Sequence, residues 1–431
     1  MKDKRLGLFS GMGMVMANMI GAGVFLSTGF MAQDMNFLQI LLAWVVGMLI
    51  AMVGAKSYSA IVQLVPQSGG EYRFLSKLIH PVLGYLAGWA SLLIGFSAPI
   101  AVCALAAGAF AGTLFPGINM IMVSVLVILS LTAAHAIGFR VSIMAQNTLV
   151  ALKMILVLGF IVVGLIYGNN AWPAWTPPNA TEGFPIGSFM RNLFFIAFAF
   201  SGWNAAIYAA SEFKNPKRDV PRAMVLGCLV VGIIYFIINW IFVANLSPEQ
   251  STVVFTYDTD HITLGHLIMQ NILGKTGAVC MSVFVIIAFI SSASAMTFLG
   301  PRVCAAMAKD GFLPAILKGK EGKPPFGAIL LQGSISLFLV LVYQLQEALS
   351  SVGALLTLFS ALTVFSLFWV YFKRREYPRP TPLVLVAGAF YLLISIVMLY
   401  FGFSGSMTLN IWVGICIITA LIGYFVKAFG R

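Results

Sequence analysis

Long apolar runs separated by short polar segments make up most of the chain. Most of these runs exceed the roughly 18 residues at which an apolar helix becomes long enough to cross a bilayer. They are also far longer than the roughly 10-residue strands of a membrane barrel, which excludes that architecture. The pattern therefore predicts an all-α polytopic membrane protein with twelve transmembrane helices, at residues 7–32, 38–64, 82–113, 118–137, 143–168, 188–212, 222–245, 272–307, 326–344, 347–372, 381–402 and 408–428.

Composition agrees with this pattern. Of the 431 residues, 60% are hydrophobic and 9% are charged, whereas a soluble domain carries roughly 25% charged residues. Residues 1–5 lead into a predicted helix that is too long and too rich in glycine for a signal peptide, so we expect no cleavable signal. The five cysteines all fall within predicted helices, so we expect no structural disulfide.

The net charge of +12 is divided unevenly between the two sets of predicted loops. The loops on the side of the termini carry Arg73, Lys77, Arg140, Lys214, Lys217, Arg218, Arg222, Lys309, Lys318, Lys320, Lys323, Lys373, Arg374, Arg375 and Arg379. The opposite loops are mainly acidic. Because basic loops stay in the cytoplasm, we expect both termini there. The basic excess is thus a topology signal, with attraction to the lipid bilayer secondary, and no nucleic acid partner is expected.

Two glycines interrupt the first predicted helix, at Gly21 and Gly23. Each costs roughly 1 kcal/mol relative to alanine in a helix interior, so the helix is weak here. Either the glycines allow close helix packing, or the helix breaks and a ligand or a cavity satisfies the freed backbone groups.

A similar interruption at Gly202 lies in the sixth predicted helix, which opens a second group of five. Two groups with an odd number of helices face opposite ways, and interruptions at corresponding positions of inverted halves predict a substrate site at the midplane. The N-termini of the half-helices suit a carboxylate, and the freed carbonyls suit an ammonium. The site is therefore predicted to bind a molecule that carries both groups.

Further motifs accompany the two interruptions. The set comprises Gly21-Ala22-Gly23-Val24-Phe25, Pro66-Gln67-Ser68-Gly69-Gly70-Glu71-Tyr72, Gln146-Asn147 with Lys153, Ser201-Gly202-Trp203-Asn204, the segment 212–223 and Met307-Ala308-Lys309-Asp310-Gly311. In this order and spacing the motifs resemble those of the amino acid–polyamine–organocation transporters, and most closely the L-type amino acid transporter branch with its bacterial relatives. The resemblance implies the inverted five-plus-five repeat called the LeuT fold, with broken helices one and six. The repeats would be residues 1–168 and 188–372, and residues 381–431 would be two peripheral helices for packing or self-association.

The resemblance also implies a set of site residues. The substrate-binding residues would be Met19, Gly21, Ala22, Gly23, Phe198, Ala199, Ser201, Trp203, Asn204 and Tyr235. In this set the amides of residues 21–23 would bind the substrate carboxylate. Carbonyls near Met19, Phe198, Ala199 and Ser201 would bind its amino group, and Phe198 would close over the substrate. Trp203 and Asn204 would shape the side-chain pocket.

Three positions depart from the family pattern. Ala22 stands where Ser or Thr is usual, Ala60 where Glu is usual, and Ser294 where Asn is common. The Ala22 amide remains available, but a hydroxyl is lost.

The positions of the acidic residues along the chain limit which substrates the site can bind. All thirteen acidic residues fall in predicted loops or at helix ends, so we expect neither a carboxylate-based ion site nor a pocket for a basic side chain. The inferred substrate is a zwitterion with a neutral side chain.

Lys153 is the only ionisable residue placed in the middle of a predicted core helix, and it matches a lysine found where sodium-coupled relatives of the fold hold sodium. It could join helices one and eight as a fixed positive charge, donating to carbonyls and to Ser291 or Ser294. It could instead load and release a proton. The resemblance favours the first role, because that branch consists mostly of exchangers.

The expected function is a sodium-independent amino acid exchanger of neutral L-amino acids that works by alternating access. A proton-coupled symporter using Lys153 and a non-transporting sensor remain alternatives. We expect no enzyme, cofactor or metal site, because the four histidines fall in loops or at helix ends and no nucleophile–base pair is placed at depth. Residues 113–118 lack the cysteine through which animal members of the branch join a glycoprotein, so no disulfide-linked heavy chain is expected. The resemblance then implies a chain that acts alone in a bacterial inner (plasma) membrane.

Overall fold

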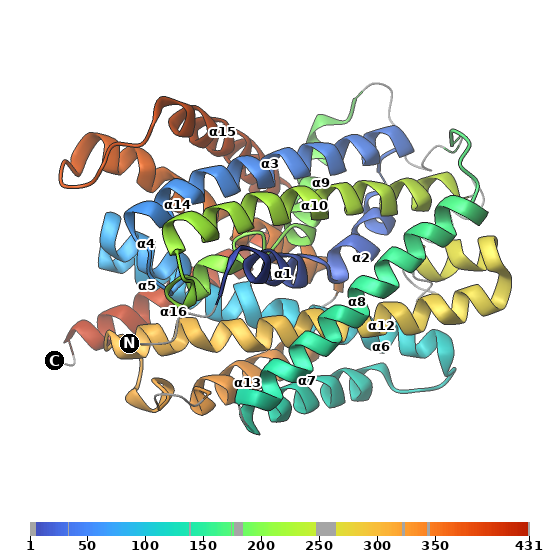
Figure 1. The fold of residues 1–431 in the computed structure, drawn as a ribbon, viewed down its shortest axis with the longest axis horizontal. Coiled ribbons are helices and arrows are strands. Elements are labelled where there is room, and N and C mark those ends of the chain that lie inside the picture. Colours follow the sequence, from blue (N-terminus) through green and yellow to red (C-terminus); the bar gives the residue numbers. More distant parts are fainter. Residues whose placement is uncertain are drawn as a thin grey trace.

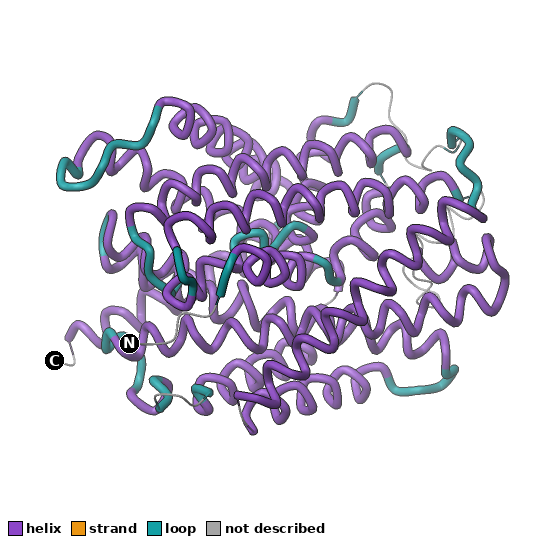
Figure 2. Tube along the Cα trace, in the orientation of Figure 1, coloured by secondary structure: helices purple, strands orange, loops and turns teal. Residues whose placement is uncertain are grey.

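The computed structural model describes residues 6–32, 34–137, 139–173, 175, 184–246, 264–320, 324–342 and 345–429. Residues 1–5, His261 and Lys323, which entered the predictions above, lie outside this part of the chain, as do the side chains of Arg140 and Gln146. Helices traverse the molecule side by side, and the connecting loops lie mostly at its two ends (Figures 1 and 2). Loop segments also lie in the centre of the bundle, where two of the helices are interrupted (Figure 2).

The described residues form the following helices in chain order. They are α1 (Leu8–Met19), α2 (Ala22–Met31), α3 (Phe37–Leu64), α4 (Gly70–Leu78), α5 (Pro81–Ala90), the π-helix η1 (Ser91–Ser97), α6 (Ala98–Leu114), α7 (Met120–Ile137), α8 (Phe139–Tyr167), α9 (Ile186–Ala199), the 3₁₀ helix η2 (Ala205–Glu212), α10 (Pro216–Ala244), α12 (Leu264–Lys309), the short 3₁₀ helix η3 (Ala315–Leu317), α13 (Phe326–Val342), α14 (Leu345–Lys373), α15 (Pro382–Gly405) and α16 (Met407–Phe429).

Nine helical segments among the described residues are long and apolar enough to cross a bilayer, and the bent pair α1 and α2 together makes a tenth candidate. Two shorter apolar helices, α9 and α13, accompany them. The prediction of an all-helical polytopic membrane protein is therefore confirmed.

The first helix breaks between α1 and α2, as the glycine pattern allowed. Ile20 has an extended backbone and Gly21 leaves the helical region, so the two halves meet at an angle of 40°. A Cβ atom at Gly21 would lie 2.4 Å from the Ser292 hydroxyl oxygen of α12, closer than real contacts allow. The break thus needs glycine because a neighbouring helix approaches it.

The second break follows α9 and ends where η2 begins. Gly202 has a φ of +96°, a left-handed conformation that favours glycine. A Cβ atom there would lie 2.7 Å from the Cβ atom of Asn18 in α1. The two breaks, distant in sequence, are therefore packed against each other.

Hydrogen bonds and ion pairs join the segments at one end of the bundle. Leu6 pairs with Phe213 as a single β-bridge, and Glu212 pairs with Arg302 of α12 at 3.3 Å. The Arg73 guanidinium of α4 lies 2.7 Å from the carboxylate of Asp310.

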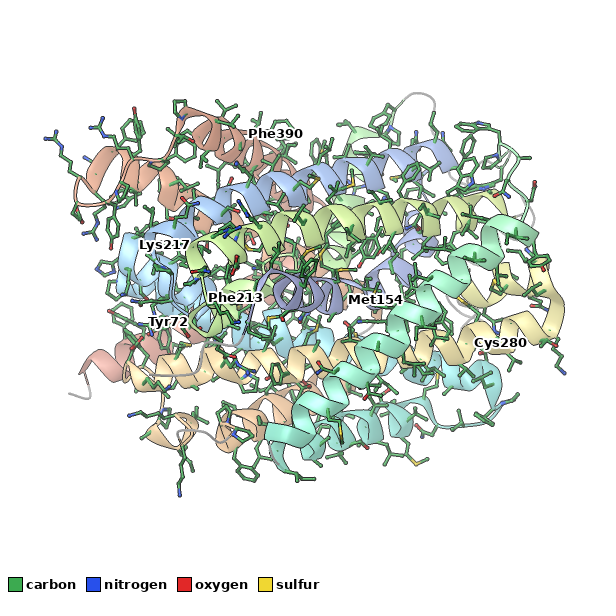
Figure 3. All side chains as sticks on the ribbon, in the orientation of Figure 1. Tyr72, Met154, Phe213, Lys217, Cys280 and Phe390 are labelled. Carbon is green, nitrogen blue, oxygen red and sulfur yellow. The ribbon has the colours of Figure 1, made fainter. Side chains whose placement is uncertain are left out.

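We call this region the basic end, after Arg73, Arg302 and Lys217, which lie there. Tyr72, Phe213 and Lys217 all lie at this end, whereas Cys280 lies towards the opposite end (Figure 3).

Candidate substrate site

The carbonyl end of α1 is occupied by a lysine ammonium. Lys153 of α8 is fully buried, and its Nζ donates to the carbonyls of Ala17 at 2.7 Å and Ile20 at 2.6 Å. A helix that ends inside a bilayer leaves carbonyls without partners, and an ammonium can satisfy several of them at once. The predicted contact of Lys153 with helix one is thus present.

Lys153 forms no hydrogen bond with Ser291 or Ser294 of α12, although the sequence analysis offered both as acceptors. The Ser294 hydroxyl lies 2.9 Å from Nε2 of the buried His135 in α7. The Ser291 hydroxyl is buried and has no hydrogen-bond partner. Both Lys153 bonds run to α1, so the lysine joins α8 to α1 rather than bridging α1 and α12.

Tyr235 of α10 holds the two breaks together. Its hydroxyl lies 2.5 Å from the carbonyl oxygen of Met19 and 3.0 Å from that of Ala199, the last residues of α1 and α9. A hydroxyl has one hydrogen, so the two carbonyls share it and each keeps capacity to accept another donor. Asn239, one turn further along, accepts from Thr28 of α2 in a short hydrogen bond, which fits a packing role for that residue.

The N-terminus of α2 is a buried helix start without a side-chain cap. Gly21 occupies the cap position, and Ala22 is 1% exposed. The hydroxyl of Ser292, which faces Gly21, is buried, and the thiol of Cys103 lies beside both this hydroxyl and the Ala22 backbone. Backbone N–H groups at a positive helix end, with a hydroxyl beside them, suit a carboxylate, which is a stronger acceptor than a thiol.

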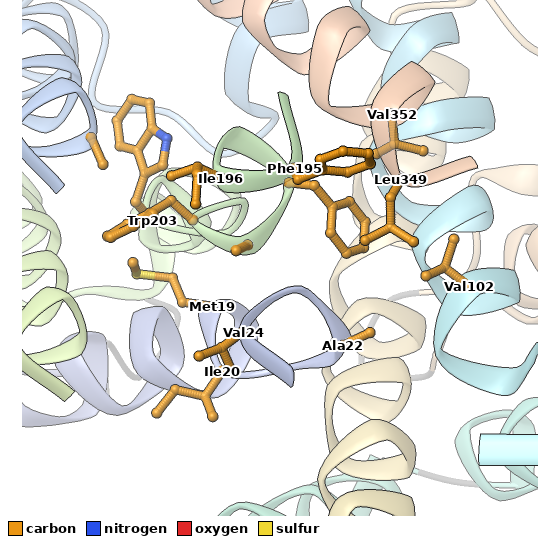
Figure 4. Close-up of a cluster of buried hydrophobic side chains, with 14 of the residues drawn as sticks. Met19, Ile20, Ala22, Val24, Val102, Phe195, Ile196, Trp203, Leu349 and Val352 are labelled. Carbon is orange, nitrogen blue, oxygen red and sulfur yellow. The ribbon is translucent and has the colours of Figure 1, made fainter. Parts of the chain in front are cut away.

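The contact between the breaks is tightly packed. A Cβ atom at Gly23 would lie 2.3 Å from the Cα atom of Ala199. Met19 reaches from α1 towards the segment that carries Ile196 and Trp203 (Figure 4). Backbone meets backbone here, so this region has no spare volume in the present conformation.

A cavity begins at the second break and extends away from this contact. Its lining residues include Asn18, Phe96, Phe200, Ser201, Gly202, Trp203, Asn204, Tyr208, Met296, Thr357, Ser360, Tyr391 and Met398. Of the predicted substrate-binding residues, Ser201, Trp203 and Asn204 line it. The remaining predicted residues lie at the packed contact or, like Tyr235, beside it. The aromatic residue that lines the cavity here is Phe200, which directly follows α9, whereas Phe198 of α9 is buried and does not line it.

The helix α15 contributes to the cavity wall through Tyr391 and Met398. The helix that the sequence analysis expected to be peripheral thus also lines the cavity, although it has no counterpart in the proposed repeat. The reason is geometric: α15 packs on both α3 and α9, so its inner face closes the gap between them.

One acidic residue is buried beside the cavity. Glu71 of α4 is 5% exposed and accepts hydrogen bonds from Tyr58, Asn204 and Tyr208. Burial raises the pKa of this carboxyl above its ordinary value, and the hydrogen bonds oppose that rise. Glu71 lies outside the apolar segments as expected, but its location in a predicted loop did not indicate that its carboxyl group is buried beside the cavity.

The sequence carried a signal for this burial. Phe74, Leu75 and Leu78 form the buried stripe of α4, and Glu71 occupies the preceding position of the same stripe at helical spacing. An acid on the apolar face of an amphipathic helix is buried with it.

Comparison with known proteins connects this geometry to transport. A family model for amino acid permeases matches residues 6–426. The chain is 26% identical over 416 residues to rat large neutral amino acids transporter small subunit 2, covering 93% of this chain and 76% of the relative. It is 23% identical over 411 residues to mouse b(0,+)-type amino acid transporter 1, covering 92% and 82%. It is 24% identical over 448 residues to mouse Asc-type amino acid transporter 1, covering 99% and 82%.

The family and these relatives are transporters and not enzymes, in agreement with the sequence analysis. The chain therefore belongs to the amino acid permease family, within the amino acid–polyamine–organocation superfamily.

Proposed function

We propose that this chain is a sodium-independent transporter that exchanges neutral, zwitterionic L-amino acids across the membrane by alternating access. The names of its relatives support an amino acid substrate, and one of these relatives is named for large neutral amino acids. The observation that carries the proposal is the Lys153 ammonium held by two carbonyls at the break of α1. A fixed cation there satisfies the carbonyls that a sodium ion would otherwise bind, so the site is complete without sodium.

The substrate would bind across both breaks. Its carboxylate would accept from the amides of residues 21–23 at the start of α2, with the Ser292 hydroxyl as a further donor. Its amino group would donate to carbonyls near Met19, Phe198, Ala199 and Ser201, competing with or joining the Tyr235 hydroxyl. Because the breaks are packed here, binding requires them to separate slightly.

The substrate side chain would enter the cavity beside Trp203 and Asn204. Among the described residues that line this cavity none carries a charge, and most are apolar. Glu71 lies behind Asn204 and is engaged by three donors, so it is not free to pair with a basic substrate. A neutral side chain is thus the best fit.

The proposed architecture has twelve spans. These are the pair α1–α2, α3, the continuous run α5–η1–α6, α7, α8, the pair α9–η2, α10, α12, α13, α14, α15 and α16. Residues 1–168 and 188–372 would be inverted repeats, because each group of five spans opens on an interrupted helix. The basic end would face the cytoplasm, in a bacterial inner membrane, and no disulfide-linked partner chain is proposed.

Exchange in proteoliposomes tests the proposal. Uptake of labelled alanine and leucine is measured with and without unlabelled amino acid inside, in sodium and in choline buffers, with arginine as competitor. We expect uptake only into preloaded vesicles, equal in both buffers and unaffected by arginine. Uptake that acidifies the lumen of empty vesicles and is lost in Lys153→Ala would instead establish the proton-coupled symporter, and binding without uptake would establish a sensor.

Two variants at Ala22 test the carboxylate site. If the backbone amide does the binding, Ala22→Ser should transport nearly as well as the wild type, whereas Ala22→Leu should abolish transport because the position is 1% exposed. Transport by both variants would place the carboxylate elsewhere.

A further inference from the structure

Three side chains converge on the carboxylate of Glu71. The Tyr58 hydroxyl of α3 donates to Oε1 at 3.1 Å, and the Asn204 amide donates to the same oxygen at 2.5 Å. The Tyr208 hydroxyl of η2 donates to Oε2 at 2.7 Å. Both oxygens are therefore occupied, and three separate parts of the chain meet at one buried group.

The carboxylate also fixes which way the Asn204 amide faces. A carboxylate only accepts, so the amide nitrogen must face Glu71. The amide oxygen is then the atom that Asn204 can offer to the cavity it lines.

The three parts do not belong to one rigid element. Asn204 and Tyr208 lie directly after the second helix break, at the start of η2 and within it. Tyr58 belongs to the continuous helix α3. Glu71 lies on α4, whose next residues, Tyr72 and Arg73, bind Asp310 after α12. Glu71 thus connects η2, which follows the second break, to α3 and α4, which contain no break.

We propose that Glu71 is a positioning residue for transport: it latches η2 to α3 and α4, and so holds the cavity closed towards the basic end. This inference rests on the proposed transport function. The cavity opens towards the basic end when Asn204 and Tyr208 leave the carboxylate, and a substrate that fills the cavity is released by that step.

The surroundings of Glu71 predict how protons act on the latch. The polar groups that face it are Tyr58 from α3, Asn204 and Tyr208 from η2, and more distantly Tyr391 from α15, while Ser360 and Thr363 from α14 interact with Tyr58. Among the described residues no lysine or arginine forms an ion pair with Glu71. Opening would hydrate the carboxyl and return its pKa towards the ordinary value, so the closed form binds a proton more tightly and acid favours closure.

Substitutions at Glu71 separate the hydrogen bonds from the charge. In Glu71→Gln the amide oxygen can still accept from Tyr58 and Asn204, and its nitrogen can donate to the Tyr208 oxygen, so the latch persists without a titratable group. In Glu71→Ala all three bonds are lost. Glu376→Gln is the matched control, because Glu376 is a surface acid near the same end whose side chain is 57% exposed.

The experiment measures access to the cavity directly. The native cysteines are replaced by alanine, and Thr357→Cys, on the cavity wall, reports its reaction with a membrane-impermeant thiol reagent added at the basic end of oriented vesicles. We expect Glu71→Ala to react at least about tenfold faster than the parent, and Glu71→Gln and Glu376→Gln to react at the parent rate at neutral pH. An unchanged rate in Glu71→Ala overturns the proposal.

A second variant covers the case in which Glu71→Ala does not fold. Tyr208→Phe removes one latch bond, together with the interactions of the same hydroxyl with Ser91 and Asn204, and should raise the labelling rate by a factor of about three to ten. Equal labelling in Tyr208→Phe and the parent would contradict the latch. Labelling does not require transport. If the variants and the parent are labelled at the expected relative rates but the wild type exchanges no amino acid, the proposed function is refuted and the latch is not.

Discussion

The two helix breaks are made in different ways. At the break between α1 and α2 the freed carbonyls are met by Lys153 and Tyr235, both from other helices and both buried. At the break after α9 the chain turns through Gly202 and opens on a cavity, and the segment beyond is held by Glu71. The groups that satisfy the first break come from long helices of the bundle, whereas the carboxylate that holds the segment after the second break comes from the short helix α4. The difference suggests a division of labour, with one break shaped for recognition and the other for movement.

Removing the ammonium from the first break should have the largest effect. Lys153→Ala leaves two buried carbonyls without a donor, at about 1–3 kcal/mol each, so we expect exchange to fall more than 100-fold and the protein to melt at lower temperature. Lys56→Ala is the control, since that lysine of α3 is exposed. Wild-type exchange by Lys153→Ala would show that the two breaks do not differ in the way described.

A methyl group at the contact between the breaks should be nearly as damaging. Gly23→Ala would place a Cβ atom 2.3 Å from the Ala199 Cα, and overpacking of this kind costs about 1–3 kcal/mol. We expect a clear drop in melting temperature in detergent and a loss of most exchange. Gly13→Ala, where no atom lies within 4 Å of the added Cβ, should match or exceed the wild type in stability.

The bridge between the breaks should contribute less. Tyr235→Phe removes the hydroxyl shared by the carbonyls of Met19 and Ala199, and each can still find another donor when substrate binds. We expect about a tenfold loss of exchange, seen mainly as weaker substrate binding. Tyr167→Phe is the control, since Tyr167 is 67% exposed, and a loss as large as that of Lys153→Ala would argue against a shared role.

The smallest effect concerns pH at the second break. Because the pKa of Glu71 is raised by burial in the closed form, closure gains from protonation as the pH falls from that raised value towards about 4.5, the ordinary carboxyl value. Exchange by the wild type should therefore slow progressively in that acid range, by a factor of a few. Initial rates across the range should be flatter in Glu71→Gln, and identical profiles would remove Glu71 from the pH response.

The sequence predicts the architecture better than the packing. Long apolar runs define their own helices, and glycines inside such runs mark where a helix can break. The partners of Lys153 could be anticipated because a buried ammonium must find acceptors at a helix end. The positions of Ser291 and Ser294 could not, since the side on which a serine meets its partner depends on how α7, α8 and α12 are rotated against one another.

The same limit applies to the second break. Asn204 and Trp203 were placed at the cavity by their motif, and both line it. The role of Tyr391 required knowing that α15 packs on α3 and α9, a contact that no local pattern encodes. Glu71 was predictable only in part. Its position on the buried stripe of α4 predicts that it is buried, but not which three side chains bind it.

The π-helix η1 has a consequence for the cavity wall that goes beyond its own residues. Its wide turn holds one residue more than an α-helical turn, and the Ser97 hydroxyl donates to the Leu92 carbonyl five residues back at 2.7 Å. An α-helix advances about 100° per residue, so this extra residue sets the rotational phase of α6 relative to α5. Deleting one residue here would turn α6 by about that angle relative to α5. After such a deletion, Gly95 and Phe96 could not line the cavity while α6 still packs its present face on α12. The one extra residue of η1 therefore fixes the rotation at which η1 faces the cavity while α6 packs on α12.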